Sequence, residues 1–356
     1  LDLRDNPGGL LEQAIRVADT FLADGTIVTT VGEGHRLRDE KKATEEGTEP
    51  FYPIVVLINP GSASASEIVS GALQNHGRGL IVGERSFGKG SVQVLYEFDD
   101  GSALKLTIAQ YLTPGDISIQ GVGIVPDIRV VPMTATAEVL DLYPSDRIVR
   151  EGDLEASLHS DRTAPEQLSV EMVRYYREPE PDIDPDVIVD PSLFEIDFEI
   201  EFAQRLLRAS GEIWEFDAML EVTSAERAAI RDEEGAHVTQ ALSDLGVDWD
   251  EGDNSAPRVV LEVTTDRDGF TVDASEEIQI TLTATNSGSE PIHRLRGLSI
   301  SDYHVFDDHE FIFGHLEAGE TRSWTVPIEV PIEEPTRQDR VDFELRIDDE
   351  TIGIVE

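Results

Sequence analysis

Residues 54–67 read Ile54-Val-Val-Leu-Ile-Asn-Pro-Gly-Ser-Ala-Ser-Ala-Ser-Glu67. The apolar run that ends at Ile58 lies between two prolines, which predicts a short buried strand. Helical spacing from Ser66 to Asn75 predicts a helix directly after the small residues. A tight strand-to-helix turn exposes backbone N–H groups at the helix N-terminus, where they can stabilise a developing oxyanion. The stretch therefore predicts an α/β fold with a candidate active-site turn.

The same alternation of helix and strand continues on both sides of this turn. Apolar residues at three- and four-residue steps predict a helix from Leu10 to Leu22, and Gly25 lies just beyond its end. Short apolar runs predict further strands at residues 80–83, 91–98 and 103–109. We therefore expect residues 1–132 to form an α/β domain.

The chain changes character beyond this point. Residues 177–186 are too charged and too rich in proline to bury a core, so residues 133–192 are predicted to be an acidic linker or extension. Helical spacing at residues 194–209 and 224–245 predicts a helical region over residues 193–250. Thr223 and Glu226 have the spacing of a capping box for the second helix.

The last hundred residues alternate apolar and polar side chains. Segments 259–263, 278–284, 323–330 and 341–347 show this pattern, which predicts strands. We expect residues 256–356 to form an all-β sandwich that resembles immunoglobulin-like adhesion modules. The expected fold class is thus multidomain: a partial α/β core, an acidic linker, a small helical region and a C-terminal sandwich.

Composition excludes several classes of protein. The 356 residues include 28 Lys and Arg against 73 Asp and Glu, and this net charge of −45 disfavours nucleic acids and anionic lipids. Only 18 of the acidic residues lie in residues 1–130, so the excess belongs mainly to the later part. The absence of cysteine excludes disulfides, thiolate zinc sites and cysteine nucleophiles. No apolar run is long enough to predict an integral membrane segment.

A nucleophilic serine in the turn needs a base, and the sequence offers two candidates. His76 ends the predicted helix, roughly 15 Å from its start, so it is interpreted as a helix cap. Lys89 is one of only four lysines in a chain that otherwise uses arginine, and a buried lysine can be neutral where an arginine cannot. Gly90 follows Lys89, which breaks the phosphate-loop pattern. The candidate nucleophiles are Ser62, Ser64 and Ser66.

Seven sequence blocks together resemble the carboxyl-terminal processing (tail-specific) serine peptidases. They are Leu3-Arg-Asp-Asn-Pro-Gly-Gly9, Gly61-Ser-Ala-Ser-Ala-Ser-Glu67, Gly77-Arg78, Val82-Gly-Glu84, Phe87-Gly-Lys-Gly-Ser-Val-Gln93, Tyr111-Leu-Thr-Pro114 and Gly121-Val-Gly-Ile-Val-Pro-Asp127. The resemblance implies a catalytic dyad of Ser64 and Lys89, with Gln93 orienting the lysine amine. It also implies an oxyanion hole made by the backbone N–H of Ala65 and that of Gly8 or Gly9.

Two departures from the family pattern bear on the function. Asn75 stands where the family often has an acidic residue, which removes a carboxylate that would keep Lys89 protonated. A neutral Lys89 further requires apolar surroundings, for which Phe87, Val92 and Val94 are candidates. The resemblance also starts in the middle of the family's catalytic domain. It therefore implies that residues 1–132 are the C-terminal part of that domain and that the chain is truncated at its N-terminus, without the family's PDZ module.

The resemblance implies a serine endopeptidase that cuts near the C-termini of protein or peptide substrates through an acyl-enzyme, without cofactor or metal. It also implies a periplasmic or exported location. The alternative is a catalytically inactive peptidase-fold scaffold whose sandwich domain binds an envelope protein. An α/β-hydrolase esterase is disfavoured, because the Gly-x-Ser-x-Gly elbow is absent.

Three polar clusters raise the question of metal binding. His304, His309 and His315 lie among acidic residues, but no open-site pattern such as His-Glu-x-x-His is present. The acidic turn around Gly252 and the alternating aspartates of residues 182–190 lack the twelve-residue calcium loop. We interpret all three clusters as solvated polar segments and expect no metal site.

Overall fold

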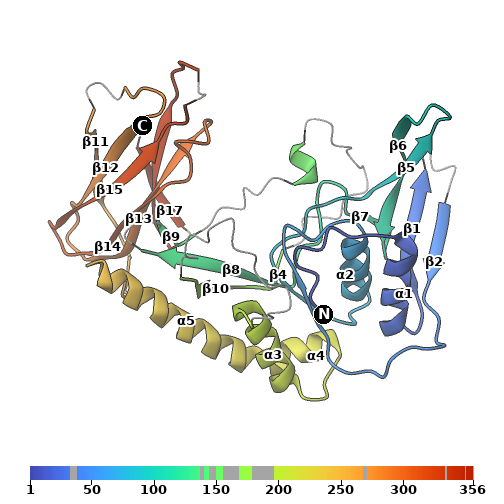
Figure 1. Cartoon of the computed structure of the whole chain (residues 1–356). Helices are drawn as coiled ribbons and strands as arrows, with labels where there is room; N and C mark the ends of the chain where they lie inside the picture. Colours follow the sequence, from blue (N-terminus) through green and yellow to red (C-terminus); the bar gives the residue numbers. More distant parts are fainter. Residues whose placement is uncertain are drawn as a thin grey trace. The chain divides into compact units, whose positions relative to one another are not determined.

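The computed structural model describes residues 1–32, 38–136, 140–143, 150–154, 168–178, 196–267, 271–332, 335–348 and 350–355. The chain divides into two compact units, each assembled from three segments (Figure 1). The first unit comprises Leu1–Val131, Asp146–Tyr175 and Ile183–Glu234, and the second comprises Pro132–Ser145, Tyr176–Asp182 and Gly235–Glu356. Among the residues described, no helix combines the length and hydropathy that crossing a bilayer requires.

A largely parallel sheet lies at the centre of the first unit. Strands β3 (Val55–Ile58) and β4 (Leu80–Gly83) pair in parallel, and β4 pairs in parallel with the start of β8 (Ile128–Ala135). Strand β10 (Glu171–Tyr176) extends the sheet beside β8. All residues of β3 and β4 are buried, as expected for parallel strands covered on both faces.

The two faces of this sheet contact different hydrophobic clusters. Val56, Ile58 and Ile81 pack with helices α1 (Leu11–Phe21) and α2 (Ala65–Asn75). The opposite face packs with α3 (Phe198–Ser210), α4 (Phe216–Val222) and the start of α5 (Ser224–Asp244). The side chains on that face are Val55, Leu57, Leu80, Val82, Ile128 and Val130. The sheet is therefore the middle layer between two helical layers.

A second, antiparallel sheet completes the first unit, and α1 and α2 contact its strand β1 (Figure 1). Its strand order is β2-β1-β6-β5, with β7 paired to β6. The strands are β1 (Thr26–Gly32), β2 (Arg38–Lys42), β5 (Ser91–Glu97), β6 (Ala103–Thr113) and β7 (Ile117–Ser118). This arrangement places β5, which begins two residues after Lys89, at the edge of the sheet.

Two antiparallel sheets enclose a common hydrophobic cluster in the second unit. The first has the order β11-β12-β15 and the second the order β14-β13-β16-β17. Their strands are β11 (Val259–Thr265), β12 (Glu277–Asn286), β13 (Ile292–Ser301), β14 (Glu310–Leu316), β15 (Thr321–Glu329), β16 (Val341–Ile347) and β17 (Glu350–Val355). The short strand β9 (Leu140–Asp141) pairs with the end of β8. The immunoglobulin-like character of this part stays a prediction.

Several local expectations need correction. The predicted linker contains a real strand, β10, in which Val173 and Tyr175 are buried between more exposed neighbours. The capping box at Thr223 is wrong, because Thr223 has helical backbone angles and its hydroxyl donates to Met219 O. Glu226 instead binds Arg205. The division into ranges 1–132, 133–192, 193–250 and 256–356 stays a prediction, and helices α3 and α4 share their core with β3 and β4.

Candidate active site

The turn between β3 and α2 holds Ser64 in an unusual backbone conformation. Its φ is 56° and its ψ is −112°, and α2 begins at the next residue. A non-glycine residue with positive φ is uncommon and is energetically strained, and such strain is typical of nucleophile turns. Ser64 is half-buried, whereas Ser62 and Ser66 are 0 % and 4 % exposed.

The hydroxyls of the two buried serines bind the N-terminal segment of the chain. Ser62 Oγ donates to Leu3 O at 2.7 Å, and Ser66 Oγ donates to Asn6 O at 3.0 Å. Ser62 Oγ also accepts from Asn59 N at 3.0 Å. These two hydroxyls therefore hold the turn together, which leaves Ser64 as the best-placed nucleophile of the three.

The carboxylate of Glu67 links the Ser64 turn to the Lys89 loop. Its Oε2 accepts from the backbone N–H of Ser64 at 2.7 Å and from that of Lys89 at 2.9 Å. Its Oε1 accepts from Ser86 Oγ at 2.6 Å and from Gly88 N at 2.7 Å. One oxygen atom thus fixes the backbones of both residues of the expected dyad.

Glu67 is fully buried, and burial raises the pKa of its carboxyl group, while the four donors oppose that rise. It also lies in the first turn of α2, where the helix dipole favours negative charge. The sequence pattern predicted the 61–67 block as a turn, without this role for Glu67. A usable signal was present, because Ser64 and Glu67 have the spacing of a capping box, in which the glutamate accepts from the backbone N–H of the serine.

The loop that carries Lys89 is held by further contacts. Ser86 Oγ accepts from Ile124 N at 2.7 Å, and Phe87 N donates to Ser62 O at 3.0 Å. Gly88 has a φ of 97°, and a Cβ there would lie 3.0 Å from the backbone of residues 121–123. Lys89 itself is half-buried, and the described part of the chain contains no carboxylate in an ion pair with it. The expected apolar surroundings of its amine stay a prediction.

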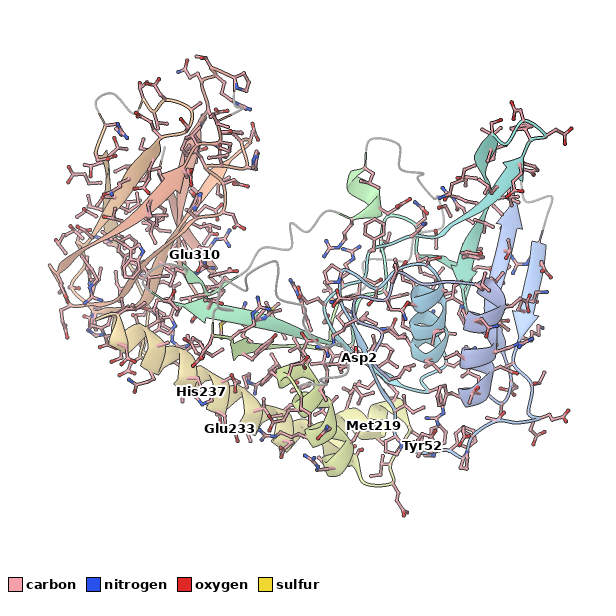
Figure 2. All side chains as sticks on the ribbon, viewed as in Figure 1. Asp2, Tyr52, Met219, Glu233, His237 and Glu310 are labelled. Carbon is pink, nitrogen blue, oxygen red and sulfur yellow. The ribbon has the colours of Figure 1, made fainter. Side chains whose placement is uncertain are left out.

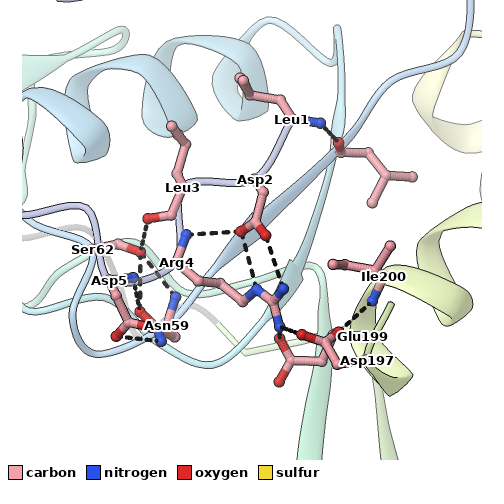
Figure 3. Close-up of polar contacts among 11 residues, drawn as sticks. Leu1, Asp2, Leu3, Arg4, Asp5, Asn59, Ser62, Asp197, Glu199 and Ile200 are labelled. Carbon is pink, nitrogen blue, oxygen red and sulfur yellow. Dashed lines mark hydrogen bonds and ion pairs between the residues drawn. The ribbon is translucent and has the colours of Figure 1, made fainter. Parts of the chain in front are cut away.

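The segment before the Gly8-Gly9 pair runs along β3, from the first residue of the strand to Asn59 just beyond its end (Figure 3). Leu1 N donates to Val55 O at 2.8 Å, and Asp5 N donates to Asn59 Oδ1 at 2.8 Å. Arg4 joins the same segment to α3 through Glu199 Oε2 at 3.0 Å. The N-terminal residues therefore belong to the structural frame of the candidate site.

The two glycines differ in their relation to the Ser64 turn. Gly8 has a φ of 95°, and a Cβ on it would lie 2.6 Å from Ala63 O and 2.7 Å from Ala65 N. The Gly8 N–H donates to Asn6 Oδ1 at 3.0 Å. A Cβ on Gly9 would meet nothing within 4 Å. The backbone of Gly8 therefore lies against Ala65, and its N–H already has an acceptor.

The other residues singled out in the sequence have structural contacts. Gln93 is exposed, and its Nε2 donates to Thr107 Oγ1 at 3.5 Å, so its action on the Lys89 amine stays a prediction. Asn75 Nδ2 donates to Thr113 Oγ1 at 3.1 Å, a bond that a carboxylate could not make. His76 caps α2, and its Nε2 lies 2.7 Å from Thr26 O.

The histidines of the second unit do not gather as the sequence suggested they could. His309 Nε2 lies 2.8 Å from Val305 O, and His315 contacts His293 instead of His304. Throughout the described residues, no group of three or more His, Asp and Glu side chains is arranged to hold a metal ion. Residues 182–190 lie outside the described residues.

Comparison with known proteins identifies the part of the chain that contains this site. Residues 1–130 match "Peptidase family S41". They form an S41 peptidase segment. A carboxy-terminal-processing protease of Bartonella bacilliformis is 56% identical to this S41 segment over 132 residues, which are 36% of this chain and 30% of the relative.

Other relatives match the same S41 segment. A carboxyl-terminal-processing protease of Synechocystis sp. is 45% identical over 140 residues, covering 39% of this chain and 32% of the relative. A solved photosystem II D1 C-terminal processing protease is 39% identical, with a TM-score of 0.33, and the match covers 36% of this chain and 33% of that chain. The chain thus spans about a third of the length of the relatives it matches.

Proposed function

We propose that this chain provides the Ser64/Lys89 dyad of a serine endopeptidase that cuts near the C-termini of protein substrates. The observation that carries the proposal is the shared acceptor: Glu67 Oε2 receives hydrogen bonds from the backbone N–H of Ser64 and of Lys89. The S41 match of residues 1–130 supports the same reaction class. The activity proposed is that of the whole protein.

The chemistry assigns a separate step to each residue of the dyad. Ser64 Oγ attacks the substrate carbonyl carbon while the neutral amine of Lys89 takes the hydroxyl proton. The C–N bond then breaks, the amine leaves with a proton from Lys89, and an acyl ester remains on Ser64. Water, activated by the same amine, hydrolyses the ester. A lysine can serve here because it can lose its proton, whereas an arginine stays charged.

The N–H of Ala65 and that of one neighbouring glycine would stabilise the oxyanion. Ala65 is the first residue of α2, so its N–H points out of the helix N-terminus. Of the two glycines, Gly9 is the better candidate, because the N–H of Gly8 donates to Asn6 Oδ1. Gln93 is proposed to orient the amine of Lys89 when substrate is bound.

The test uses tail cleavage by the full-length protein. Ser64→Ala and Lys89→Ala should each reduce kcat/KM for a C-terminally labelled protein substrate by at least about 1000-fold, while the fold is unchanged. Lys105→Ala, on the exposed part of β6, and Ser70→Ala, within α2, are the matched controls. Both controls should retain activity. Undiminished turnover in either dyad variant would exclude the mechanism.

A serine-reactive phosphonyl probe separates the enzyme from an inactive scaffold. The proposed peptidase should be labelled at Ser64, and labelling should fail in Lys89→Ala because the hydroxyl then lacks its base. A scaffold that binds an envelope protein through its β-rich part would not be labelled in either form.

The names of the relatives support substrates with C-terminal tails, and the relatives include bacterial, cyanobacterial and chloroplast proteins. We therefore propose a periplasmic or exported location. Osmotic-shock fractionation of the source cells tests this: the protein should be released with periplasmic markers, and recovery with cytoplasmic markers would contradict it.

A further inference from the structure

Two histidines outside the S41 segment face each other, each through its Nδ1 atom. His293 on β13 and His315 on β14 have their Nδ1 atoms 3.2 Å apart. Their rings meet edge to face, with centroids 4.5 Å apart and an interplanar angle of 81°. Both side chains are half-buried, and both belong to the second unit. The pair therefore presents two convergent nitrogens at a partly solvent-accessible position.

A carboxylate neighbours the pair and favours one tautomer of His315. His315 Nε2 lies 3.3 Å from Glu317 Oε1, and a carboxylate can only accept a hydrogen bond. A neutral His315 that donates from Nε2 to Glu317 has a lone pair on Nδ1. In that tautomer, the Nδ1–H of His293 is the donor of the contact between the two Nδ1 atoms. A carboxylate on the far nitrogen of a histidine is the usual support of a histidine that binds a metal.

The surroundings of the pair favour a cation. The ring of His293 lies over Gly252, where a Cβ would be only 2.1 Å from Nε2, so only glycine fits. Gly252 is the centre of the acidic turn 248–253, which carries four carboxylates. The positive charge nearest in sequence, Arg294, is paired with Glu251 at 3.0 Å and lies 3.6 Å from Asp348.

We propose that His293 and His315 bind one divalent transition-metal ion of the zinc class through their Nδ1 atoms. Two nitrogens 3.2 Å apart suit an ion at about 2.0–2.1 Å from each, with a ligand angle close to tetrahedral. On binding, the proton of His293 moves from Nδ1 to Nε2, and water fills the remaining positions. Imidazole ligands select zinc-class ions over Mg²⁺ and Ca²⁺, which prefer oxygen.

Calorimetric titration of the chain with Zn²⁺, in an excess of Mg²⁺ that occupies the surface carboxylates, tests the proposal. The wild type should show a site that His293→Ala and His315→Ala each weaken at least about 10-fold, and Glu317→Gln should weaken it about 10-fold as well. His309→Ala is the matched control, because its ring contacts Val305 O elsewhere on the same sheet. Equal Zn²⁺ affinity in the wild type and the His293→Ala/His315→Ala double variant would overturn the proposal.

A second measurement needs no variant. ¹⁵N NMR of the wild-type histidine rings should show the Nδ1 resonances of His293 and His315 shifting when Zn²⁺ is added, with His293 changing tautomer. Thermal unfolding in the presence of a chelator establishes that each variant is folded before its affinity is compared. Unchanged ring resonances with saturating Zn²⁺ would show that the pair is only a structural hydrogen bond.

Discussion

A single carboxylate, that of Glu67, accepts four hydrogen bonds that join the Ser64 turn to the Lys89 loop. Glu67→Gln replaces one acceptor oxygen by an NH₂ group that faces two donors. Because both donors are then buried without a partner, we expect the free energy of unfolding to fall by about 2–5 kcal/mol. Urea denaturation measures the loss, and peptidase activity should fall with it.

Ser86→Ala is the graded control for this substitution, because it leaves the carboxylate intact and removes one of its four donors, together with the acceptor of Ile124 N. It should cost about 1–2 kcal/mol. An equal loss in both variants would mean that Glu67 does not act as the shared acceptor described here.

Asp127 gives the S41 segment a pH dependence that one substitution can remove. Its carboxylate accepts from Ile81 N at 2.8 Å and from Gln74 Nε2 at 3.0 Å, and burial raises its pKa to about 6. Since this pKa lies above the ordinary value of 3.8, stability from the protonated form is complete below pH 3.8 and is lost as the pH rises through 6.

Asp127→Asn should flatten the stability profile between pH 4 and pH 7, because an amide does not titrate there. Its NH₂ group faces one of the two donors, Ile81 N or Gln74 Nε2, so the free energy of unfolding at pH 4 should fall by about 1–3 kcal/mol. Chemical denaturation at several pH values measures both effects. A variant with the wild-type pH profile would show that another group titrates in this range.

Helix α3 docks on the N-terminal segment through one guanidinium group (Figure 3). Arg4 Nη1 lies 2.8 Å from Asp197 and 3.0 Å from Glu199, and Nη2 lies 2.8 Å from Asp2. Burial raises the pKa of Glu199 to about 7, and Arg4 opposes that rise. The link therefore depends on a carboxylate that is costly to ionise without its partner.

Arg4→Met should lower the free energy of unfolding by about 2–4 kcal/mol at pH 8, where it leaves an ionised Glu199 buried. At pH 5 the loss should be much smaller, because Glu199 is then protonated. Thermal unfolding at both pH values measures the difference. Arg38→Met, which breaks the exposed pair with Asp116, should leave stability unchanged at either pH. Equal losses from Arg4→Met at both pH values would contradict this role for Glu199.

Elements with a plain apolar pattern were predictable, and elements built on long-range polar contacts were not. Strands β4 and β16 have the predicted bounds, and α2 begins one residue before the predicted start. Strand β13 was missed because it contains Arg296, a charged residue that is 1 % exposed. Arg296 Nη1 lies 3.1 Å from Glu310 Oε1 (Figure 2), and no local sequence pattern predicts this ion pair.

The candidate site was predictable to a similar extent. The sequence indicated Ser64 and Lys89 through their blocks, whereas the role of Glu67 depends on four donors that become neighbours only on folding. The blocks also indicated Ser64 among the three serines, and the structure adds a physical reason, because the hydroxyls of Ser62 and Ser66 bind the carbonyl groups of Leu3 and Asn6.

The net charge of −45 acts on the molecule as a whole. Repulsion among so many carboxylates destabilises the compact state, and salt screens that repulsion. We expect the melting temperature to rise by several degrees when NaCl is increased from about 0.02 M to about 0.5 M, where the Debye length falls to about 4 Å. Differential scanning calorimetry measures the shift. Tetramethylammonium chloride should act like NaCl, and a salt-independent melting temperature would contradict the prediction.

The sheet that carries the β3 turn is covered on one face by helices α3 to α5, which all lie beyond the S41 match. A chain cut after residue 130 would keep all seven blocks that resemble the peptidase family. It would nevertheless expose Val55, Leu57, Leu80, Val82, Ile128 and Val130 to water. Six adjacent aliphatic side chains on a solvent-exposed sheet face promote aggregation. The S41 segment is therefore smaller than the unit that can fold on its own. A version of the protein made to isolate this segment should retain residues 196–234.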